Sequence, residues 1–235
     1  MPGHATKPNM GRNEGSRRIA SLHVHADDQV FIGYGDWEVN DGATDLVSLD
    51  PSTGTYTVHE LAVRTEAFQR FRSIDGVLYA PFTDPVGYWE ASAPYTTVPA
   101  QPVGMGGWAH VFDVVKHGGR LWVFGSSLHE ATGIASAAWS EDQGLTWNFT
   151  YPGNQIGDYA RATAAGVEEG TLWCSVNDVR YDWDGTEWIA SMSRVPTIPT
   201  VTYPQLLEGV TATARTSTHW VVGTNDGLIY TRPID

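Results

Sequence analysis

The chain has 235 residues and a formal net charge of −13; 41% of its residues are hydrophobic and only 17% are charged. This balance is typical of a compact globular protein and favours it over a disordered one. An acidic body repels phosphate backbones and anionic lipids, so neither nucleic acid nor a membrane surface is expected as a partner. Cys174 is the only cysteine, which excludes an intrachain disulfide and a zinc site of several thiolates.

Residues 1–17 are rich in Gly, Pro and Asn and are predicted to form an extended arm rather than a strand. The arm is basic, because Lys7, Arg12 and Arg17 outnumber the single acidic residue Glu14. A basic arm is suited to docking on an acidic neighbouring chain. The sequence shows neither the apolar core of a secretory signal nor an apolar run long enough to span a membrane. We therefore expect a protein that is made in the cytoplasm and is not inserted into a membrane.

One strand-and-turn pattern recurs five times after the arm. In four copies a small turn is followed by an apolar and then an aromatic residue, and a weaker fifth copy has His219 in the apolar position; the aromatic residues are Phe31, Tyr79, Trp122, Trp173 and Trp220. Their steps of 48, 43, 51 and 47 residues match the length of one four-stranded propeller blade. The sequence therefore predicts an all-β protein, with an extended arm over residues 1–17 and a five-bladed β-propeller over residues 18–235.

The strand before each of these turns is predicted to be the innermost strand of its blade. Examples are Ile19–His25, Val111–Lys116 and Val210–Arg215. Third and fourth strands should be joined by tight turns at Asp50, Asp142 and Asp184. The fifth copy reaches only its third strand, at 228–231, so its outer strand is either absent or supplied by the arm.

The most specific local motif is a turn that fits the Asp-box pattern S-x-D-x-G-x-T-W. Its defining residues are Ser140, Asp142, Gly144, Thr146 and Trp147. The Asp side chain can accept hydrogen bonds from turn amides, the Gly supplies a backbone angle that other residues avoid, and the Trp packs into the blade. These are structural roles, so the motif predicts fold rather than activity.

Polar residues recur five positions after each repeated aromatic residue. They are Asp36, Asp84, Ser127, Asp178 and Asn225, the last followed by Asp226. In a propeller these positions lie on one face around the channel mouth. The carboxylates there either form a cation, sugar or partner site, or bond their own turn backbone as strand-end acids commonly do.

Two predicted loops place aromatic and acidic groups together. They are Tyr34-Gly35-Asp36-Trp37 and Gly87-Tyr88-Trp89-Glu90. Such rings are suited to stacking against a sugar, although they could equally anchor a protein contact or cover the ends of the blades. Trp37, Tyr88 and Trp89 are therefore candidate binding residues together with Asp36, Asp84, Asp178 and Asp226.

A glycosidase on this fold would need two or three carboxylates projecting from inner strands. The candidates are Asp113, Asp158 and Glu208, with Arg161 and His110 near them in the sequence. Sialidase chemistry would need an arginine cluster, and the inner strands offer only scattered arginines, Arg72, Arg161 and Arg215. His23 and His25 share one side of the first strand but have no visible third ligand, so no metal site and no cofactor is expected.

Beyond the Asp-box pattern, three strings carry a family resemblance. They are Ile32-Gly33-Tyr34-Gly35-Asp36-Trp37, Leu78-Tyr79-Ala80-Pro81-Phe82-Thr83-Asp84-Pro85 and His110-Val111-Phe112-Asp113-Val114. Over about residues 18–150 the chain resembles propeller proteins of tailed bacteriophages, minor tail or other virion proteins with Asp-box or sialidase-like repeats. The resemblance implies a non-enzymatic structural or adhesion protein of the virion, on a tail or head, whose partners are other virion proteins and a cell-surface glycan. The alternative is a glycan-directed glycoside hydrolase, either sialidase-like or a five-bladed glycosidase.

Overall fold

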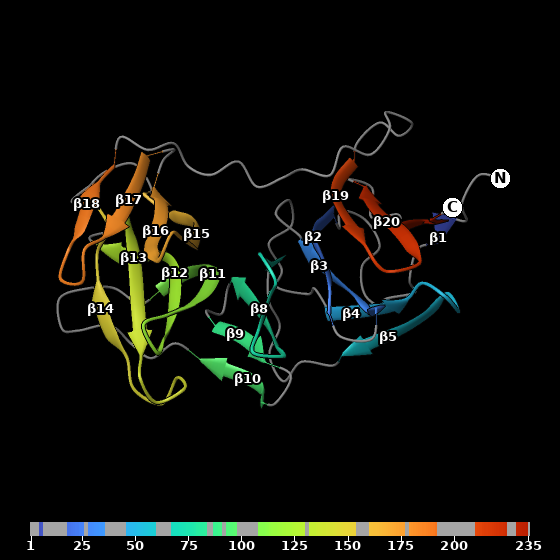
Figure 1. Ribbon diagram of the computed structural model, residues 1–235, viewed down its shortest axis with the longest axis horizontal. Coiled ribbons are helices and arrows are strands. Elements are labelled where there is room, and N and C mark those ends of the chain that lie inside the picture. The colour runs from blue at the N-terminus through green and yellow to red at the C-terminus, as the bar shows by residue number, and fades with distance from the viewer. Residues whose placement is uncertain are drawn as a thin grey trace. The chain divides into compact units, whose positions relative to one another are not determined.

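The computed structural model describes residues 5–6, 18–25, 28–35, 46–59, 67–83, 87–90, 93–97, 108–129, 132–153, 160–176, 179–191, 210–224 and 229–234. These ranges contain strands and turns but no α-helix, so the predicted all-β class is confirmed for them (Figure 1). None of the described segments is a helix with the length and hydropathy needed to cross a membrane. The chain divides into two compact units, Met1–Leu78 with Ile198–Asp235, and Tyr79–Thr197.

The first unit begins with a four-stranded antiparallel sheet in the predicted strand order. Its strands are β2 (Arg18–Val24), β3 (Val30–Gly35), β4 (Leu46–Asp50) and β5 (Thr55–His59). Gly35 of β3 also pairs with Ala67 of β6 (Ala67–Phe68). The next hairpin joins β7 (Arg72–Ile74) to β8 (Val77–Thr83), and the division between the units falls within β8.

The N-terminal arm supplies the outer strand that the last repeat lacks. The final sheet has the order β1-β21-β20-β19, in which β1 is Ala5–Thr6, β19 is Val210–Arg215, β20 is His219–Thr224 and β21 is Ile229–Pro233. Ala5 pairs with Tyr230 and Thr6 with Ile229, in antiparallel register. The fifth copy is therefore also a four-stranded sheet, built from both ends of the chain.

The first and last sheets pack on each other within the first unit. Their shared core contains Ile19, Ile32 and Val47 from the first sheet and Val221 and Ile229 from the last. In Figure 1 the blue strands β2 and β3 accordingly lie beside the red strands β19 and β20. A side-chain oxygen of Asp28 also accepts a hydrogen bond from the backbone N–H of Ser217, at 3.1 Å. Residues at opposite ends of the chain are thus joined by a core and by a polar contact.

The second unit holds two further four-stranded antiparallel sheets. One consists of β11 (Trp108–His117), β12 (Arg120–His129), β13 (Thr132–Ser140) and β14 (Asn148–Thr150). The other consists of β15 (Ala162–Glu168), β16 (Thr171–Val176), β17 (Val179–Trp183) and β18 (Trp188–Ala190). The strands β9 (Gly87–Glu90) and β10 (Ala93–Thr97) follow β8 as a further antiparallel ladder. The repeat predicted from the sequence is therefore a repeat of sheets.

A β-bulge recurs at one place on four first strands. The register shifts between Ile19 and Ser21, Val111 and Asp113, Ala162 and Ala164, and Val210 and Ala212. In three of these sheets, the first-strand residue two positions after the bulge pairs with the repeated aromatic residue of the second strand: Phe31, Trp122 or Trp173. In the last sheet the residue at this position pairs with Val221 instead. Trp220 therefore precedes the equivalent position by one residue. Val221 is fully buried, whereas Trp220 is partly exposed.

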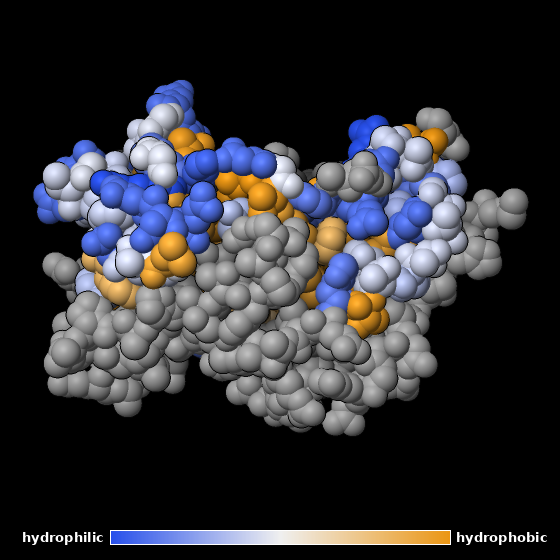
Figure 2. Space-filling view, turned by 90° about the horizontal axis from the view of Figure 1, so that it is seen from below, coloured by the Kyte–Doolittle hydropathy of each residue, from blue (hydrophilic) through white to orange (hydrophobic). Residues whose placement is uncertain are grey.

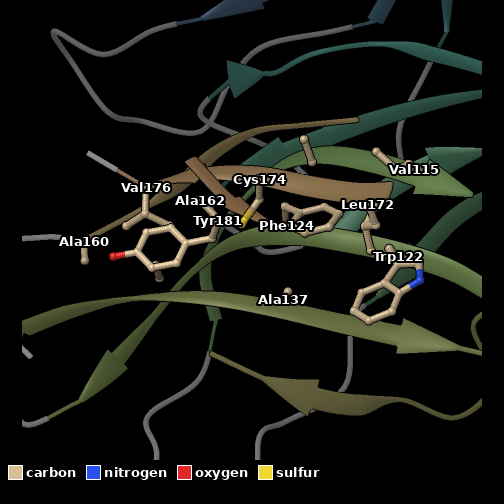
Figure 3. Close-up of a cluster of buried hydrophobic side chains, with 12 residues drawn as sticks. Val115, Trp122, Phe124, Ala137, Ala160, Ala162, Leu172, Cys174, Val176 and Tyr181 are labelled. Atoms are coloured by element: carbon tan, nitrogen blue, oxygen red, sulfur yellow. The ribbon is translucent and has the colours of Figure 1, made fainter. Parts of the chain in front are cut away.

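The core of the second unit lies between its two sheets and ends in aromatic rings. Figure 3 shows this row of side chains, with Phe124, Leu172 and Cys174 in the middle and Trp122 at one end. Trp139, Trp183 and Trp188 pack against the cluster. We call Trp122, Trp139, Trp183 and Trp188 the tryptophan cluster. On the face seen in Figure 2 the exposed apolar residues form separate groups among hydrophilic ones.

Candidate functional site

A cavity opens where three turns of the second unit meet. It has a volume of about 320 Å³ and is lined by side chains of both sheets. These residues are His117, Arg120, Trp122, Thr171, Trp183 and Asp184. The turns are those between β11 and β12, between β15 and β16, and after β17; successive antiparallel strands alternate in direction, so all three turns lie at the same end of their sheets. We call this cavity the turn pocket.

Glycine-containing turns shape the wall of the turn pocket. Gly118, Gly119 and Gly170 have positive φ angles of 58°, 78° and 83°, and all three belong to two-residue hairpin turns. This left-handed backbone matches the twist of the flanking strands and is easily adopted by glycine. Because the turns are so short, the side chains of Arg120 and Thr171 are placed directly at the rim.

Aromatic rings form the apolar part of the turn pocket. Trp122 and Trp183 meet edge to face, with ring centroids 5.4 Å apart and an interplanar angle of 63°. Trp122 is 1% exposed, yet its indole N–H has no hydrogen-bond partner. In Figure 3 this nitrogen points away from the rest of the buried cluster. A buried donor without an acceptor costs free energy, so the Trp122 side chain carries an unmet polar requirement.

The charged residues at the turn pocket already have partners. Arg120 Nε donates to Glu141 Oε1 at 3.0 Å, and the guanidinium lies over the ring of Trp139, 3.9 Å from its centroid. Asp184 Oδ1 accepts hydrogen bonds from the amides of Thr186 and Glu187, at 2.7 and 2.8 Å. These backbone bonds and the Thr186 hydroxyl lower the pKa of Asp184. Both charges are thus largely satisfied within the protein.

The predicted turn at Ser140–Trp147 has a closed hydrogen-bond network. Asp142 Oδ1 accepts from the Thr146 amide at 2.8 Å and Oδ2 accepts from the Thr146 hydroxyl at 2.6 Å. Ser140 Oγ donates to Asp142 at 2.7 Å and accepts from the Gly144 amide at 2.7 Å. Trp147 Nε1 donates to the Gly144 carbonyl at 3.0 Å, and Gly144 has a φ of 92°. Every residue of the motif serves the turn itself.

In the related turns at Asp50 and Asp184 an Asp carboxylate also accepts hydrogen bonds from residues of its own turn. Asp50 Oδ1 accepts from the amide and the hydroxyl of Ser52, at 2.9 and 2.6 Å. The hydrogen bonds from Ser52 and Thr53 lower the pKa of Asp50. The turns between third and fourth strands in three of the repeats are thus held by one carboxylate each, as predicted from the sequence.

Asp113, a candidate catalytic acid, is wholly buried and joins the two sheets of the second unit. One carboxylate oxygen accepts from the amide of Val114 at 3.0 Å, and the other accepts from the amide of Ala165, on β15, at 3.0 Å. The bulge at Val111–Asp113 places the side chain at this junction. The observed contacts of the carboxylate are structural.

Arg161 and His110, predicted near Asp113, both contact Phe112. Arg161 lies 5.9 Å from the Phe112 centroid, and the His110 ring stacks on it at 5.5 Å. The His110 ring also bonds the hydroxyl of Ser126 at 3.2 Å. The other candidate acids, Asp158 and Glu208, lie outside the described residues, so their distance from Asp113 is not part of the structure.

Most of the predicted carboxylate ring also lies outside the described residues. These positions are Asp36, Asp84, Asp178, Asn225 and Asp226, and the loop residue Trp37 lies outside them as well. Tyr88 and Trp89 belong to β9, where they pair with Pro81 and Ala80, and only their backbone is described. The one ring position that is described in full, Ser127, is buried and hydrogen-bonded to Ser136.

His23 of β2 and His25, which follows β2, converge on one hydroxyl in the first unit. His23 Nε2 lies 2.7 Å from Ser73 Oγ, and His25 Nδ1 lies 2.8 Å from the same oxygen. Burial, followed by the charges of His25 and Arg72, lowers the pKa of His23 to about 4. Among the described residues no group of three or more His, Cys, Asp or Glu is placed to hold a metal ion.

Sequence reasoning missed the turn pocket because its residues come from three separate turns. The only local signal was a tryptophan close to a glycine-containing turn, in Gly119-Arg120-Leu121-Trp122 and Trp183-Asp184-Gly185. The described part of the candidate site is therefore at the turn end of the second unit, opposite the end at which the carboxylate ring was predicted.

No protein-family model and no curated protein sequence matches the chain. Among solved structures, the chain is similar to the extracellular domain of a protein described as a hybrid two-component system of B. thetaiotaomicron, with a TM-score of 0.52 and 10% identity. That match covers 92% of this chain but only 27% of the other, so the chain spans about a quarter of its length. Virginiamycin B lyase from Staphylococcus aureus matches with a TM-score of 0.46, 10% identity and 99% coverage of both chains. BamB from Moraxella catarrhalis matches with a TM-score of 0.45 and 13% identity over 91% of this chain and 57% of that one. At these identities the likeness concerns the fold alone.

Proposed function

We propose that the chain is a five-bladed β-propeller that serves as a non-enzymatic structural or adhesion module of a tailed-bacteriophage particle. The observation that carries the non-enzymatic role is that the Asp113 carboxylate is buried and hydrogen-bonded to backbone amides. A glycosidase on this fold needs free carboxylates on its inner strands. Asp113 instead uses both carboxylate oxygens to accept backbone N–H groups from β11 and β15. It acts as a clamp between adjacent sheets.

The pairing of β1 with β21 supports closure of the propeller. Both ends of the chain contribute to the last sheet, which therefore has four strands like the first. The last sheet also shares a core with the first. Such an arrangement joins the final blade to the beginning of the ring without a covalent link, which removes sheet edges that would otherwise invite aggregation.

The place in a virion is supported by the resemblance of residues 18–150 to phage propeller proteins. The remaining basic residues of the arm, Lys7, Arg12 and Arg17, are proposed to contact acidic surfaces of other virion proteins. A rigid propeller with short turns offers both faces for attachment, one to the particle and one to a cell-surface glycan.

The test is to apply an antiserum raised against the purified chain to gradient-purified particles of the phage that encodes it. We expect the particles to be labelled at the tail or head and to contain the intact chain. Particles that infect normally and lack the chain would refute the virion role.

A second assay addresses the glycoside hydrolase alternative. The purified chain is incubated with fluorogenic glycosides, including a sialoside, and with cell-surface polysaccharide, and the release of product is measured. We expect no turnover above that of the protein-free blank. Turnover by the purified chain that is lost in Asp113→Asn, Asp158→Asn or Glu208→Gln would replace the adhesion role with an enzymatic one.

A further inference from the structure

We propose that His23, His25 and Ser73 form an acid-sensitive junction, which holds β7 against the first sheet and releases it in mild acid before the first unit unfolds. We call these three residues the histidine junction. His23 lies on β2, His25 follows β2, and Ser73 lies on β7, the strand that begins the next repeat. The inference goes beyond the proposed function and does not depend on it, because it concerns a contact within the first unit.

The first argument is the geometry of the shared hydroxyl. His23 Nε2 and His25 Nδ1 lie 2.7 and 2.8 Å from the same oxygen, Ser73 Oγ. All hydrogen bonds of this group are satisfied when Ser73 donates its one proton to a neutral ring and accepts the N–H of the other ring. A protonated imidazole can only donate, so protonation of the accepting ring removes the acceptor for the Ser73 proton. Because Ser73 is exposed, water can replace the rings when the junction opens.

The second argument is that the surroundings of His23 oppose a positive charge. Burial, followed by the charges of His25 and Arg72, lowers the pKa of His23 from 6.5 to about 4. The carboxylate of Asp75, in the exposed turn after β7, is not among the groups that shift this pKa. Protonation of both rings would thus bring two imidazolium groups together on one hydroxyl, next to a guanidinium, and the repulsion would push β2 and β7 apart.

Phe31 places a third histidine beside the junction. Phe31 is the cross-strand partner of His23, meets His25 edge to face with ring centroids 6.0 Å apart, and stacks on His59 with centroids 5.4 Å apart. His59 Nε2 lies 3.0 Å from the Ser48 hydroxyl, and burial lowers the pKa of His59. The first sheet therefore resists protonation at two of the three rings around Phe31.

The third argument is that the other junction of the first sheet does not depend on a histidine. The first and last sheets share an apolar core and are joined by hydrogen bonds from Ser217 to the carboxylate of Asp28. These hydrogen bonds lower the pKa of Asp28 from 3.8, so Asp28 stays ionised in mild acid. Acid should therefore act on the contact with β7 and leave the contact with the last sheet intact.

The two pKa values of His23 give the size of the effect. In the closed junction the pKa is about 4, and in the open junction it returns to the ordinary 6.5. The open form binds the proton more tightly, so acid favours opening. Between pH 7 and pH 5 the ratio of open to closed junction should rise about twentyfold.

The experiment follows the backbone amides of the full-length chain at pH 7 and pH 5. Signal positions are read from ¹H–¹⁵N spectra, and hydrogen exchange is corrected for the effect of pH on the chemical step. We expect the signals of Arg72, Ser73 and Ile74 to shift and their protection from exchange to fall by up to about twentyfold. The amides of Ser217 and Val221, in the last sheet, should keep their protection.

Three variants assign the effect to the junction. His23→Gln combined with His25→Gln removes both titrating rings and should abolish the difference between pH 7 and pH 5. Ser73→Ala removes the shared hydroxyl, so β7 should already be released at pH 7, and the His23 ring should titrate closer to 6.5. His117→Gln, at the end of β11 in the second unit, is the matched control and should behave like the original chain.

The inference is overturned if the protection of β7 is the same at pH 7 and pH 5, or if it falls equally in the original chain and in the variant without both histidines. A simultaneous loss of protection at Ser217 and Val221 would also overturn it. Acid would then act on the whole first unit rather than on one junction within it.

Discussion

Gly223 of β20 lies directly against Ile19 of β2, so that a Cβ atom at position 223 would come within 2.6 Å of Ile19 Cγ2. Ile19 is 1% exposed and belongs to the core shared by the first and last sheets. The contact therefore fixes how closely the two ends of the chain approach. No side chain larger than hydrogen fits at 223 without displacing Ile19.

Gly223→Ala is expected to destabilise the protein by about 1–3 kcal/mol, the usual cost of overpacking a core. The change should appear as a lower midpoint of urea unfolding. Ile19→Ala makes room for the added methyl group, so Gly223→Ala should cost less stability in the Ile19→Ala protein than in the original chain. Additive costs in the double variant would contradict a direct contact.

Asp113→Ala should be among the most destabilising single changes in the second unit. It removes the carboxylate that accepts from the amides of Val114 and Ala165, and losing the partner of a buried donor costs about 1–3 kcal/mol. Asp113→Asn keeps one acceptor oxygen and should lose less. Thr163→Ala, at an exposed position of β15, is the control. Urea unfolding measures all three, and an Asp113→Ala protein as stable as the control would contradict the clamp.

Local patterns predicted those features whose partners are close in the sequence. The Ser140–Trp147 turn was predicted residue by residue because all its hydrogen bonds join residues within four positions of one another. The sequence left open whether the arm supplies the outer strand of the last repeat and did not locate β1, because Ala5 and Thr6 form a two-residue strand without periodicity in a Gly- and Pro-rich segment. Its pairing depends on residues at the other end of the chain.

The candidate site shows the same limit. The sequence identified Asp113 as an acid on an inner strand, but its second acceptor bond comes from Ala165, 52 residues away. The turn pocket likewise combines His117, Thr171 and Trp183, which share no spacing rule. Only folding shows whether a carboxylate faces solvent or a backbone amide, and which turns meet.

Acid should destabilise the first unit through His23. Burial, with smaller effects from His25 and Arg72, lowers the pKa of His23 from 6.5 to about 4. His23 is therefore protonated near pH 6.5 in the unfolded chain but only near pH 4 in the folded chain. The free energy of unfolding should fall as the pH is lowered between these values and should be unaffected by His23 above them.

His23→Gln removes this titration while keeping a polar side chain next to Ser73, so its stability should vary less between pH 6.5 and about pH 4. Thermal unfolding over this pH range measures the difference. His117→Gln, at the end of β11 in the second unit, controls for the loss of a histidine. Equal pH slopes for the original chain and His23→Gln would contradict the assignment to His23.

Asp142 should also contribute stability that is lost as the pH falls, but in a more acidic range than His23. The hydrogen bonds from Thr146, and then from Ser140, lower its pKa from 3.8 to about 2. The stabilisation is complete above the unfolded value of 3.8 and is lost as the pH falls towards about 2. Asp142→Asn should therefore lower the melting temperature at neutral pH, and the deficit should shrink in acid. Glu169→Gln, at an exposed hairpin position, is the control, and a deficit that stays constant down to about pH 2 would contradict the role of the charge.

Closure of the last sheet by the arm can be tested with an engineered disulfide between Ala5→Cys and Tyr230→Cys. These residues are direct antiparallel partners, and the Cα separation of about 4.5–5.5 Å in such pairs falls within the range that a disulfide bridges. The single native cysteine, Cys174, is buried and should not compete. We expect oxidation to give a crosslinked monomer.

The crosslinked monomer should unfold at a higher temperature than its reduced form, because the bond closes a loop of nearly the whole chain and restricts the unfolded state. Ala5→Cys with Arg232→Cys is the matched control. Residue 232 lies two positions beyond Tyr230 on β21, which moves its Cα about 7 Å along the strand from the direct partner of Ala5, so this pair should not crosslink. Non-reducing electrophoresis and mass spectrometry distinguish the products. A crosslink found only between two chains would assign β1 to a neighbouring copy, and the ring would then be closed by assembly rather than by the chain itself.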